Sequence, residues 1–264
     1  MSTSVEKKKQ NLFIILTAIF LTNAVLAEMI GNKIFSFEET VGLAPNAINF
    51  FGFYPSFNLT AGVVIWPVVF IFTDITNEYF GKKGVRKMSL LAVGMITYSF
   101  FVIWIVSGLS PAEFWLNVNA TDDAGNPFNV NYAFNKIFIQ SNRIIVGSLV
   151  AFMVGQLLDV LVFQKLRKLA KGKMIWLRAT GSTLISQLVD SFVVLFLAFY
   201  FLAPKEASWS VGQVLSVGTS NYIYKFAVAL SITPLIYLAH WIIDRYLGDA
   251  AEEIKEEAAS KGFL

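Results

Sequence analysis

Two short polar motifs of one type stand in otherwise apolar segments: Gly155-Gln156-Leu157-Leu158-Asp159 and Ser186-Gln187-Leu188-Val189-Asp190. In a helix, the Gln-x-x-Asp spacing places an amide and a carboxylate on adjacent turns of one face. Together the two groups offer donors and acceptors to the edge of a flat polar ligand. Polar contacts between membrane helices would use the same residue types, so that alternative stays open. Because two successive segments repeat the motif, we favour a binding role.

Further ionisable residues lie in long apolar segments, where each costs a few kcal/mol and usually faces protein or a water-filled cavity. They are Glu28, Asp74, Glu78, Arg143, Asp159, Asp190 and Lys225. Near the middle of their segments lie Asn23, Gln156 and Gln187, with Trp66 and Tyr222 as aromatic neighbours. Gln156 shares a face with Asp159 and Gln187 with Asp190, whereas Asn23 and Glu28 are about 140° apart on their helix. The residues alone favour the binding and movement of a polar, planar solute.

The elements that must position these residues are membrane helices. Of the 264 residues, 56% are hydrophobic and only 15% are charged, whereas a soluble domain carries about 25% charged residues. Six segments are long and apolar enough to span a bilayer: 11–33, 59–80, 87–107, 141–164, 179–202 and 216–240. Most Lys and Arg residues fall at the N-terminus, after the second, fourth and sixth segments, and this pattern places both termini in the cytoplasm.

The predicted fold class is therefore an all-α integral membrane protein with six transmembrane helices. Residues 1–248 form a single transmembrane domain, and residues 249–264 form a charged cytoplasmic tail whose helix is expected to be solvated. The chain has no cysteine and one histidine, which argues against a thiolate metal site and a Ser-His-Asp triad. No P-loop or nucleophile elbow occurs, and a net charge of +3 does not favour nucleic acid. We predict no enzyme activity, metal or cofactor, although an intramembrane hydrolase using Asp159 and Asp190 stays open.

At these motifs the chain resembles the queuosine precursor transporters, also called vitamin-uptake transporters. The ordered residues that carry the resemblance are Trp66-Pro67, Thr73-Asp74, Asn77-Glu78-x-x-Gly81, the two Gln-x-x-Asp motifs, Arg178, Ser182-Thr183, Asn23, Lys225 and Pro234. The resemblance implies uptake of 7-cyano- or 7-aminomethyl-7-deazaguanine across the inner membrane of a bacterium. It also implies a fold similar to the substrate-binding subunits of energy-coupling-factor vitamin transporters, working without a dedicated ATPase.

With a guanine-like solute in mind, we assign roles to the polar residues. The expected binding set is Asn23, Glu28, Trp66, Gln156, Gln187, Asp190, Tyr222 and Lys225, with Asp190 or Glu28 on the donor edge of the base. The expected gating or coupling set is Asp74, Glu78, Arg143 and Asp159, with Arg86 or Arg178 as cationic partners at the inner side. Static ion pairing at helix ends is the alternative for this second set. A binding subunit for another vitamin-like or purine-like solute, dependent on a partner ATPase, and a homo-oligomeric state also stay open.

Overall fold

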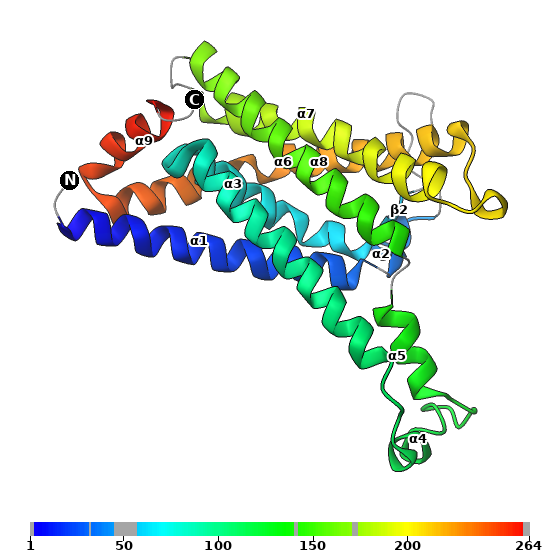
Figure 1. Ribbon diagram of the computed structural model, residues 1–264. Helices are drawn as coiled ribbons and strands as arrows, with labels where there is room; N and C mark the ends of the chain where they lie inside the picture. Colours follow the sequence, from blue (N-terminus) through cyan, green and yellow to red (C-terminus); the bar gives the residue numbers. More distant parts are fainter. Residues whose placement is uncertain (1–2, 32, 45–56, 140–141, 171–173, 261–264) are drawn as a thin grey trace.

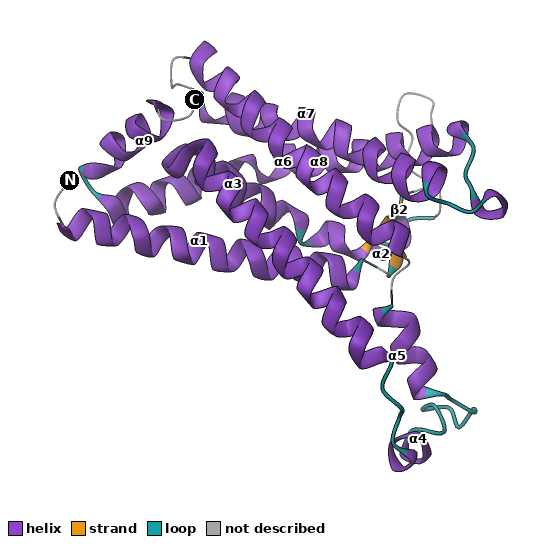
Figure 2. Cartoon of the chain, viewed as in Figure 1, coloured by secondary structure: helices purple, strands orange, loops and turns teal. Residues whose placement is uncertain are grey.

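The computed structural model describes residues 3–31, 33–44, 57–139, 142–170 and 174–260. The described chain is mostly helical, with one two-stranded antiparallel sheet (Figures 1 and 2). In order, the elements are α1 (Thr3–Ile30), β1 (Ile34–Ser36), α2 (Phe37–Thr40), β2 (Asn58–Thr60), η1 (Ala61–Val64), α3 (Trp66–Ser107), α4 (Glu113–Val118), α5 (Val130–Phe138), α6 (Asn142–Leu169), α7 (Ile175–Leu195), the π-helical turn η2 (Phe196–Phe201), η3 (Lys205–Ala207), α8 (Val211–Leu247) and α9 (Ala250–Ser260).

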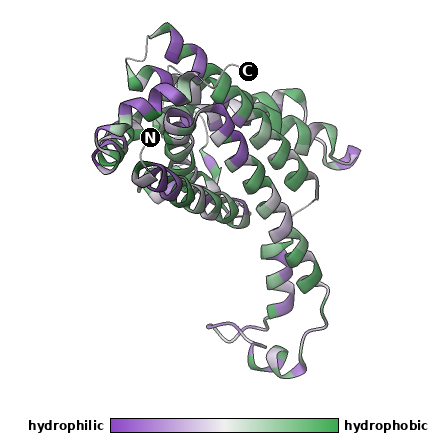
Figure 3. Ribbon diagram, turned by 60° about the vertical axis from the view of Figure 1, so that its left-hand side comes forward, coloured by the Kyte–Doolittle hydropathy of each residue, from purple (hydrophilic) through white to green (hydrophobic). Residues whose placement is uncertain are grey.

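Within these described residues, five helices are long and apolar enough to cross a membrane. They are α1, α3, α6, α7 with its π-helical extension, and α8. The predicted spans 59–80 and 87–107 both fall largely within α3, which is 42 residues long and breaks its helical geometry at Gly81. Figure 3 shows apolar residues along the lengths of the long helices and hydrophilic residues gathered where the two termini lie.

Gly81 turns the chain of α3 back on itself. Its φ of 63° and ψ of −167° lie in a region that side-chain-bearing residues rarely adopt. A Cβ atom at this position would also stand 2.6 Å from the Ala258 carbonyl oxygen. After the turn, the Thr76 hydroxyl of the first half donates to the Met88 sulfur of the second, 3.6 Å away. The two halves of α3 therefore lie side by side as a hairpin, as Figure 1 shows.

Among the described residues, three groups of buried apolar side chains hold the bundle together, and the smallest joins Phe163 of α6, Ala179 of α7 and Ile236 of α8. The two larger groups involve α1 and α3. One joins α1 to both halves of α3 and to α6, and includes Phe20, Val69, Met88 and Phe152. The other joins α1, α3, α8 and α9, and includes Leu16, Tyr79, Leu247 and Ile254. These contacts fix the positions of α3 and α6, which carry two walls of the site described below.

The C-terminal helix α9 is not free in solvent, contrary to the expectation of a solvated tail. Ala251, Ile254 and Ala258 form an apolar stripe with a spacing of three and four residues, and all three are buried. On the polar side, Lys9 of α1 pairs with Glu257 at 2.7 Å. The stripe places α9 against the Gly81 turn and against α1 and α8.

At the other end of the bundle, β1 pairs with β2 in the register Ile34↔Thr60. Glu38 of α2 is buried there, and its carboxylate accepts the Phe57 backbone N–H at 3.0 Å. Beyond this end, the second half of α3 leads to α4 and α5, which project away from the bundle (Figure 1). The site therefore lies among α3, α6, α7 and α8 rather than in the projecting part.

Candidate functional site

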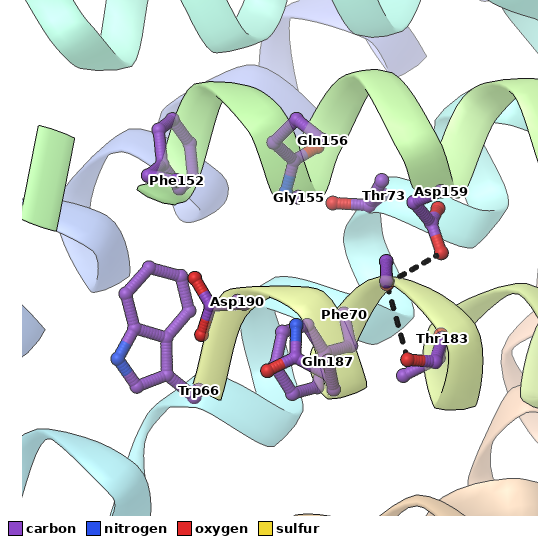
Figure 4. A pocket seen from close by; sticks show the side chains of 11 residues that line it. Trp66, Phe70, Thr73, Phe152, Gly155, Gln156, Asp159, Thr183, Gln187 and Asp190 are labelled. Atoms are coloured by element: carbon purple, nitrogen blue, oxygen red, sulfur yellow. Dashed lines mark hydrogen bonds between the residues drawn. The ribbon is translucent and has the colours of Figure 1, made fainter. Parts of the chain in front are cut away.

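A small cavity lies between the first half of α3, α6 and α7 (Figure 4). Its volume is about 30 Å³, which is enough room for a water molecule. Its lining consists of Trp66, Phe70 and Thr73 from α3, Phe152, Gly155, Gln156 and Asp159 from α6, and Thr183, Ser186, Gln187 and Asp190 from α7. Both Gln-x-x-Asp motifs of the sequence thus meet at one place.

Helical periodicity explains why each helix contributes its set. The lining residues of α6 and of α7 follow the same spacing of i, i+3, i+4 and i+7, starting at Phe152 and at Thr183. The lining residues of α3 follow i, i+4 and i+7 from Trp66. One polar face of α6 therefore meets an equivalent face of α7, and α3 closes the space with aromatic side chains.

Asp190 is paired with a cation from a fourth helix. The Lys225 ammonium of α8 donates to the Asp190 carboxylate at 2.5 Å, and both side chains are mostly buried, at 16% and 21% exposure. Figure 4 shows the Trp66 ring beside the Asp190 carboxylate. This end of the cavity combines a paired carboxylate with an aromatic wall.

Glu28 stands near this pair. Its carboxylate accepts a hydrogen bond of 2.6 Å from the Ser148 hydroxyl of α6, and it is close enough for the Asp190 charge to act on it. Glu28 is not among the described residues that line the cavity. The carboxylate therefore belongs to the surroundings of Asp190.

Two further predicted residues, Asn23 and Tyr222, lie elsewhere. The Asn23 side-chain amide donates to the Ile19 carbonyl of its own helix at 2.8 Å. Tyr222 packs edge-on against Phe226 in α8. Neither of them is among the described cavity-lining residues. Arg143 falls in the first turn of α6, and its side chain lies outside the part of the chain that the structure describes.

Asp159 lines the same cavity but has no cationic partner among the described residues. Its Oδ1 accepts a long hydrogen bond of 3.4 Å from Ser186, and its Oδ2 accepts none from the described residues. The neighbouring Ser182 hydroxyl donates to the Ala179 carbonyl at 3.0 Å. Asp74 of α3 is 1% exposed, and neither of its oxygens accepts a hydrogen bond from a described residue. The charges of Asp159 and Glu78 both act on it.

Glu78 is the acid that pairs with the cations at the end of the bundle where α9 packs. Its carboxylate lies 2.9 Å from the Arg178 guanidinium of α7 and 3.4 Å from that of Arg167 of α6. Arg167 also donates to the backbone carbonyl of Lys255 in α9 at 2.8 Å. Of the two expected partners, Arg178 is thus the one that contacts Glu78, whereas the Arg86 side chain is exposed.

A groove of about 860 Å³ opens beside this ion-pair cluster, lined by α3, α6, α7, α8 and α9. We call it the α9 groove; Glu78, Arg167, Arg178 and Lys255 are among its lining residues. Burial disfavours the charged form of Lys255, but hydrogen bonds from its ammonium to Glu252 and Asp244 outweigh burial and raise its pKa. Acidic neighbours therefore hold Lys255, one of the cations that line the groove, in its charged form.

Some lining residues were not predicted as site residues. They are Phe70, Thr73 and Phe152 in the cavity, and Arg167 in the ion-pair cluster at Glu78. The spacing of Phe70 and Thr73 from Trp66 would have placed them on one face. Phe152 gave no comparable signal, because an apolar residue in an apolar helix looks the same whether it faces lipid or a cavity.

Comparison with known proteins gives consistent matches. A family model described as "Putative vitamin uptake transporter" matches residues 60–239. A "Probable queuosine precursor transporter" of Bacillus subtilis (strain 168) is 33% identical over 190 residues, which cover 71% of this chain and 75% of that protein. A protein of the same name from Haemophilus influenzae is 29% identical, with 74% and 72% covered.

A "Queuosine precursor transporter" of Escherichia coli (strain K12) is 28% identical, with 66% of this chain and 69% of that protein covered. No solved structure matches the chain. The matched range contains α3, α6, α7 and most of α8, and hence the whole cavity. The chain belongs to this vitamin uptake transporter family, a family of multi-pass bacterial membrane proteins that move solutes rather than transform them.

Proposed function

We propose that the protein carries queuosine precursors, the 7-cyano- or 7-aminomethyl-7-deazaguanine bases, across the bacterial inner membrane. The observation that carries the proposal is the cavity in which two Gln-x-x-Asp pairs face each other beside Trp66. The relatives are named as queuosine precursor transporters, and these names support the same substrate class.

Recognition follows from the chemistry of a guanine-like edge, which presents a ring N–H and an exocyclic amine next to a carbonyl. The Asp190 carboxylate accepts from the two donors, and such charge-assisted hydrogen bonds are roughly twice as strong as neutral ones. The Gln187 amide donates to the carbonyl. Trp66, beside Asp190, stacks on the face of the base, and the Lys225 ammonium holds the Asp190 carboxylate in place.

The cavity must widen to admit a base, since about 30 Å³ is room for one or two water molecules. Trp66 stands at the start of α3, directly after the short helix η1, and forms the aromatic wall. Rotation of this side chain, or movement of the η1 end of α3, opens the cavity toward the β1–β2 side. The transporter therefore alternates between a closed cavity and an opened one.

We further propose that the chain crosses the membrane six times, with α3 crossing twice and both termini in the cytoplasm. The charge distribution along the sequence supports this topology, as does the hairpin at Gly81. In it, the α9 groove faces the cytoplasm. Because the chain has no cysteine, single cysteines can be introduced at exposed positions such as Asp123 and Glu253. A membrane-impermeant thiol reagent added to intact cells should label the first and not the second. Labelling of both contradicts the topology.

The decisive experiment measures binding and uptake of the labelled base with purified protein and with proteoliposomes. Asp190→Asn removes the charge that accepts both donors, and we expect binding to weaken by about 100-fold, or roughly 3 kcal/mol. Asp123→Asn, in an exposed loop, is the matched control and should behave as wild type. Unchanged binding in a folded Asp190→Asn protein would falsify the pocket assignment, and wild-type protein that neither binds nor moves the base would sink the proposed function itself.

A further inference from the structure

Asp74 is the buried acid that recognition of the base leaves without a role. Its side chain is 1% exposed, less than that of Asp159 at 5%. Among the described residues, no donor reaches either of its oxygens. A charged carboxylate in such surroundings costs several kcal/mol, because neither hydrogen bonds nor a counter-ion compensate the loss of water. Within membranes, acids of this kind commonly belong to proton pathways.

The position of Asp74 links two hollows of the molecule. On one side, Asp159 lines the cavity between α3, α6 and α7, as does Thr73, the residue before Asp74. On the other side, Glu78, one helical turn further along α3, lines the α9 groove. The charges of both Asp159 and Glu78 act on Asp74. The three acids therefore form a series from the cavity to the groove.

The cationic side chains near this series, and one histidine, have other partners. Arg178 of α7 and Arg167 of α6 contact Glu78. His240 of α8 lies 3.2 Å from the Tyr79 hydroxyl. Lys255 of α9 pairs with Asp244 and Glu252, and Lys9 of α1 pairs with Glu257. Asp74 and Asp159 are thus left without a cationic partner among the described residues, although the charge of one acts on the other. Two neighbouring carboxyl groups in one dry site share a proton more readily than they carry two charges.

We propose that Asp74 and Asp159 form a proton site that couples entry of the solute to entry of a proton. This inference rests on the proposed transport function and adds its driving force. A proton from outside water reaches Asp159 through the opened cavity and forms the O–H bond of Asp74. When the site opens inward, that O–H bond breaks and the proton passes to water in the α9 groove, which regenerates the carboxylate.

The first test uses proteoliposomes with the membrane potential clamped at zero and the uncharged 7-cyano-7-deazaguanine as solute. If one proton enters with each base, an alkaline interior should produce about tenfold accumulation for each unit of pH difference. A protonophore should abolish this accumulation. Asp74→Asn keeps the shape of the protonated acid, so it should still equilibrate the base but accumulate none, whereas Asp123→Asn should accumulate it as wild type does.

The proposal is overturned if wild type equilibrates the base without responding to the pH difference, or if Asp74→Asn accumulates it normally. A second measurement does not depend on transport. The infrared spectrum of purified wild type minus that of Asp74→Asn, both at neutral pH, should contain a protonated-carboxyl band. Asp159→Asn should shift this band. If no vesicle takes up the base under any condition, the proposed function fails, and absence of the Asp74 band then overturns the proton site as well.

Discussion

The two Gln-x-x-Asp motifs are alike in spacing and occupy equivalent faces of α6 and α7, yet their aspartates have different surroundings. Asp190 lies 2.5 Å from the Lys225 ammonium, whereas Asp159 has serine hydroxyls and another acid nearby. A carboxylate with a cation beside it stays charged, and one beside a second acid favours a proton. The difference lies in α8 and α3, not in the motifs themselves. In the proposals made above, the same local motif therefore serves two uses: Asp190 suits recognition of a ligand edge, and Asp159 suits proton handling.

The largest expected effect on stability comes from removing the cation that distinguishes the two sites. Lys225→Met leaves Asp190 charged without a partner, and because the pair is partly buried the loss should be about 2 kcal/mol of stability, between exposed and fully buried pairs. Thermal unfolding of the purified protein should show a transition several degrees lower. The double variant Lys225→Met with Asp190→Asn should recover much of this loss.

That double variant also provides the control, because a cycle of four proteins isolates the pair from the separate effects of each substitution. If Lys225→Met unfolds at the wild-type temperature, the pair contributes nothing to the folded state. Asp190 and Asp159 would then be electrostatically equivalent, and the division of roles between the two motifs would fail.

A smaller effect should separate the two amides. Gln156 accepts a hydrogen bond of 3.3 Å from the buried Ser89 hydroxyl, while the Gln187 side chain has no such partner among the described residues. Gln156→Ala should therefore lower stability by about 1–2 kcal/mol, because it strands a buried hydroxyl. Gln187→Ala should leave the unfolding temperature near wild type and weaken base binding by about tenfold, through loss of one hydrogen bond.

The measurements are the unfolding temperature and the dissociation constant of the base for both variants. Gln10→Ala, at an exposed position of α1, controls for the loss of an amide as such. Equal losses of stability in the two variants would contradict the assignment of Gln156 to structure and Gln187 to the ligand.

Much of this site follows from the sequence, because the residues that share a helix face are set by the helical repeat. The two motifs, Trp66 and the paired Lys225 are all at or beside the cavity. Periodicity says nothing of which faces meet, and so it could not exclude Asn23, which bonds back to its own helix, or Tyr222. It assigned Asp159 to the gating or coupling set without indicating that this side chain lines the cavity.

The fold shows the same division between local and long-range information. The sequence predicts separate spans on either side of Gly81 but not the closeness of the hairpin, which depends on a backbone conformation at one residue. The tail was expected to be solvated because its charges dominate its composition. Its small apolar stripe of Ala251, Ile254 and Ala258 is weak as a signal but sufficient for packing once α3 presents the Gly81 turn. Whether a short apolar stripe is buried therefore depends on the surface that packs against it.

The smallest expected effect tests what holds Asp159. Ser186→Ala removes a hydrogen bond that is long, at 3.4 Å, from a hydroxyl that also donates to the Thr183 carbonyl at 3.0 Å. A bond near the distance limit contributes little, so the unfolding free energy should change by less than about 0.5 kcal/mol. Thermal unfolding of Ser186→Ala beside the Ser4→Ala control, at an exposed position of α1, measures the change. A large loss would mean that Asp159 is held as a charged acceptor, and the contrast with Asp190 would then rest on hydroxyl groups rather than on the cation of α8; a negligible loss leaves the absence of a cation as the property that separates the two motifs.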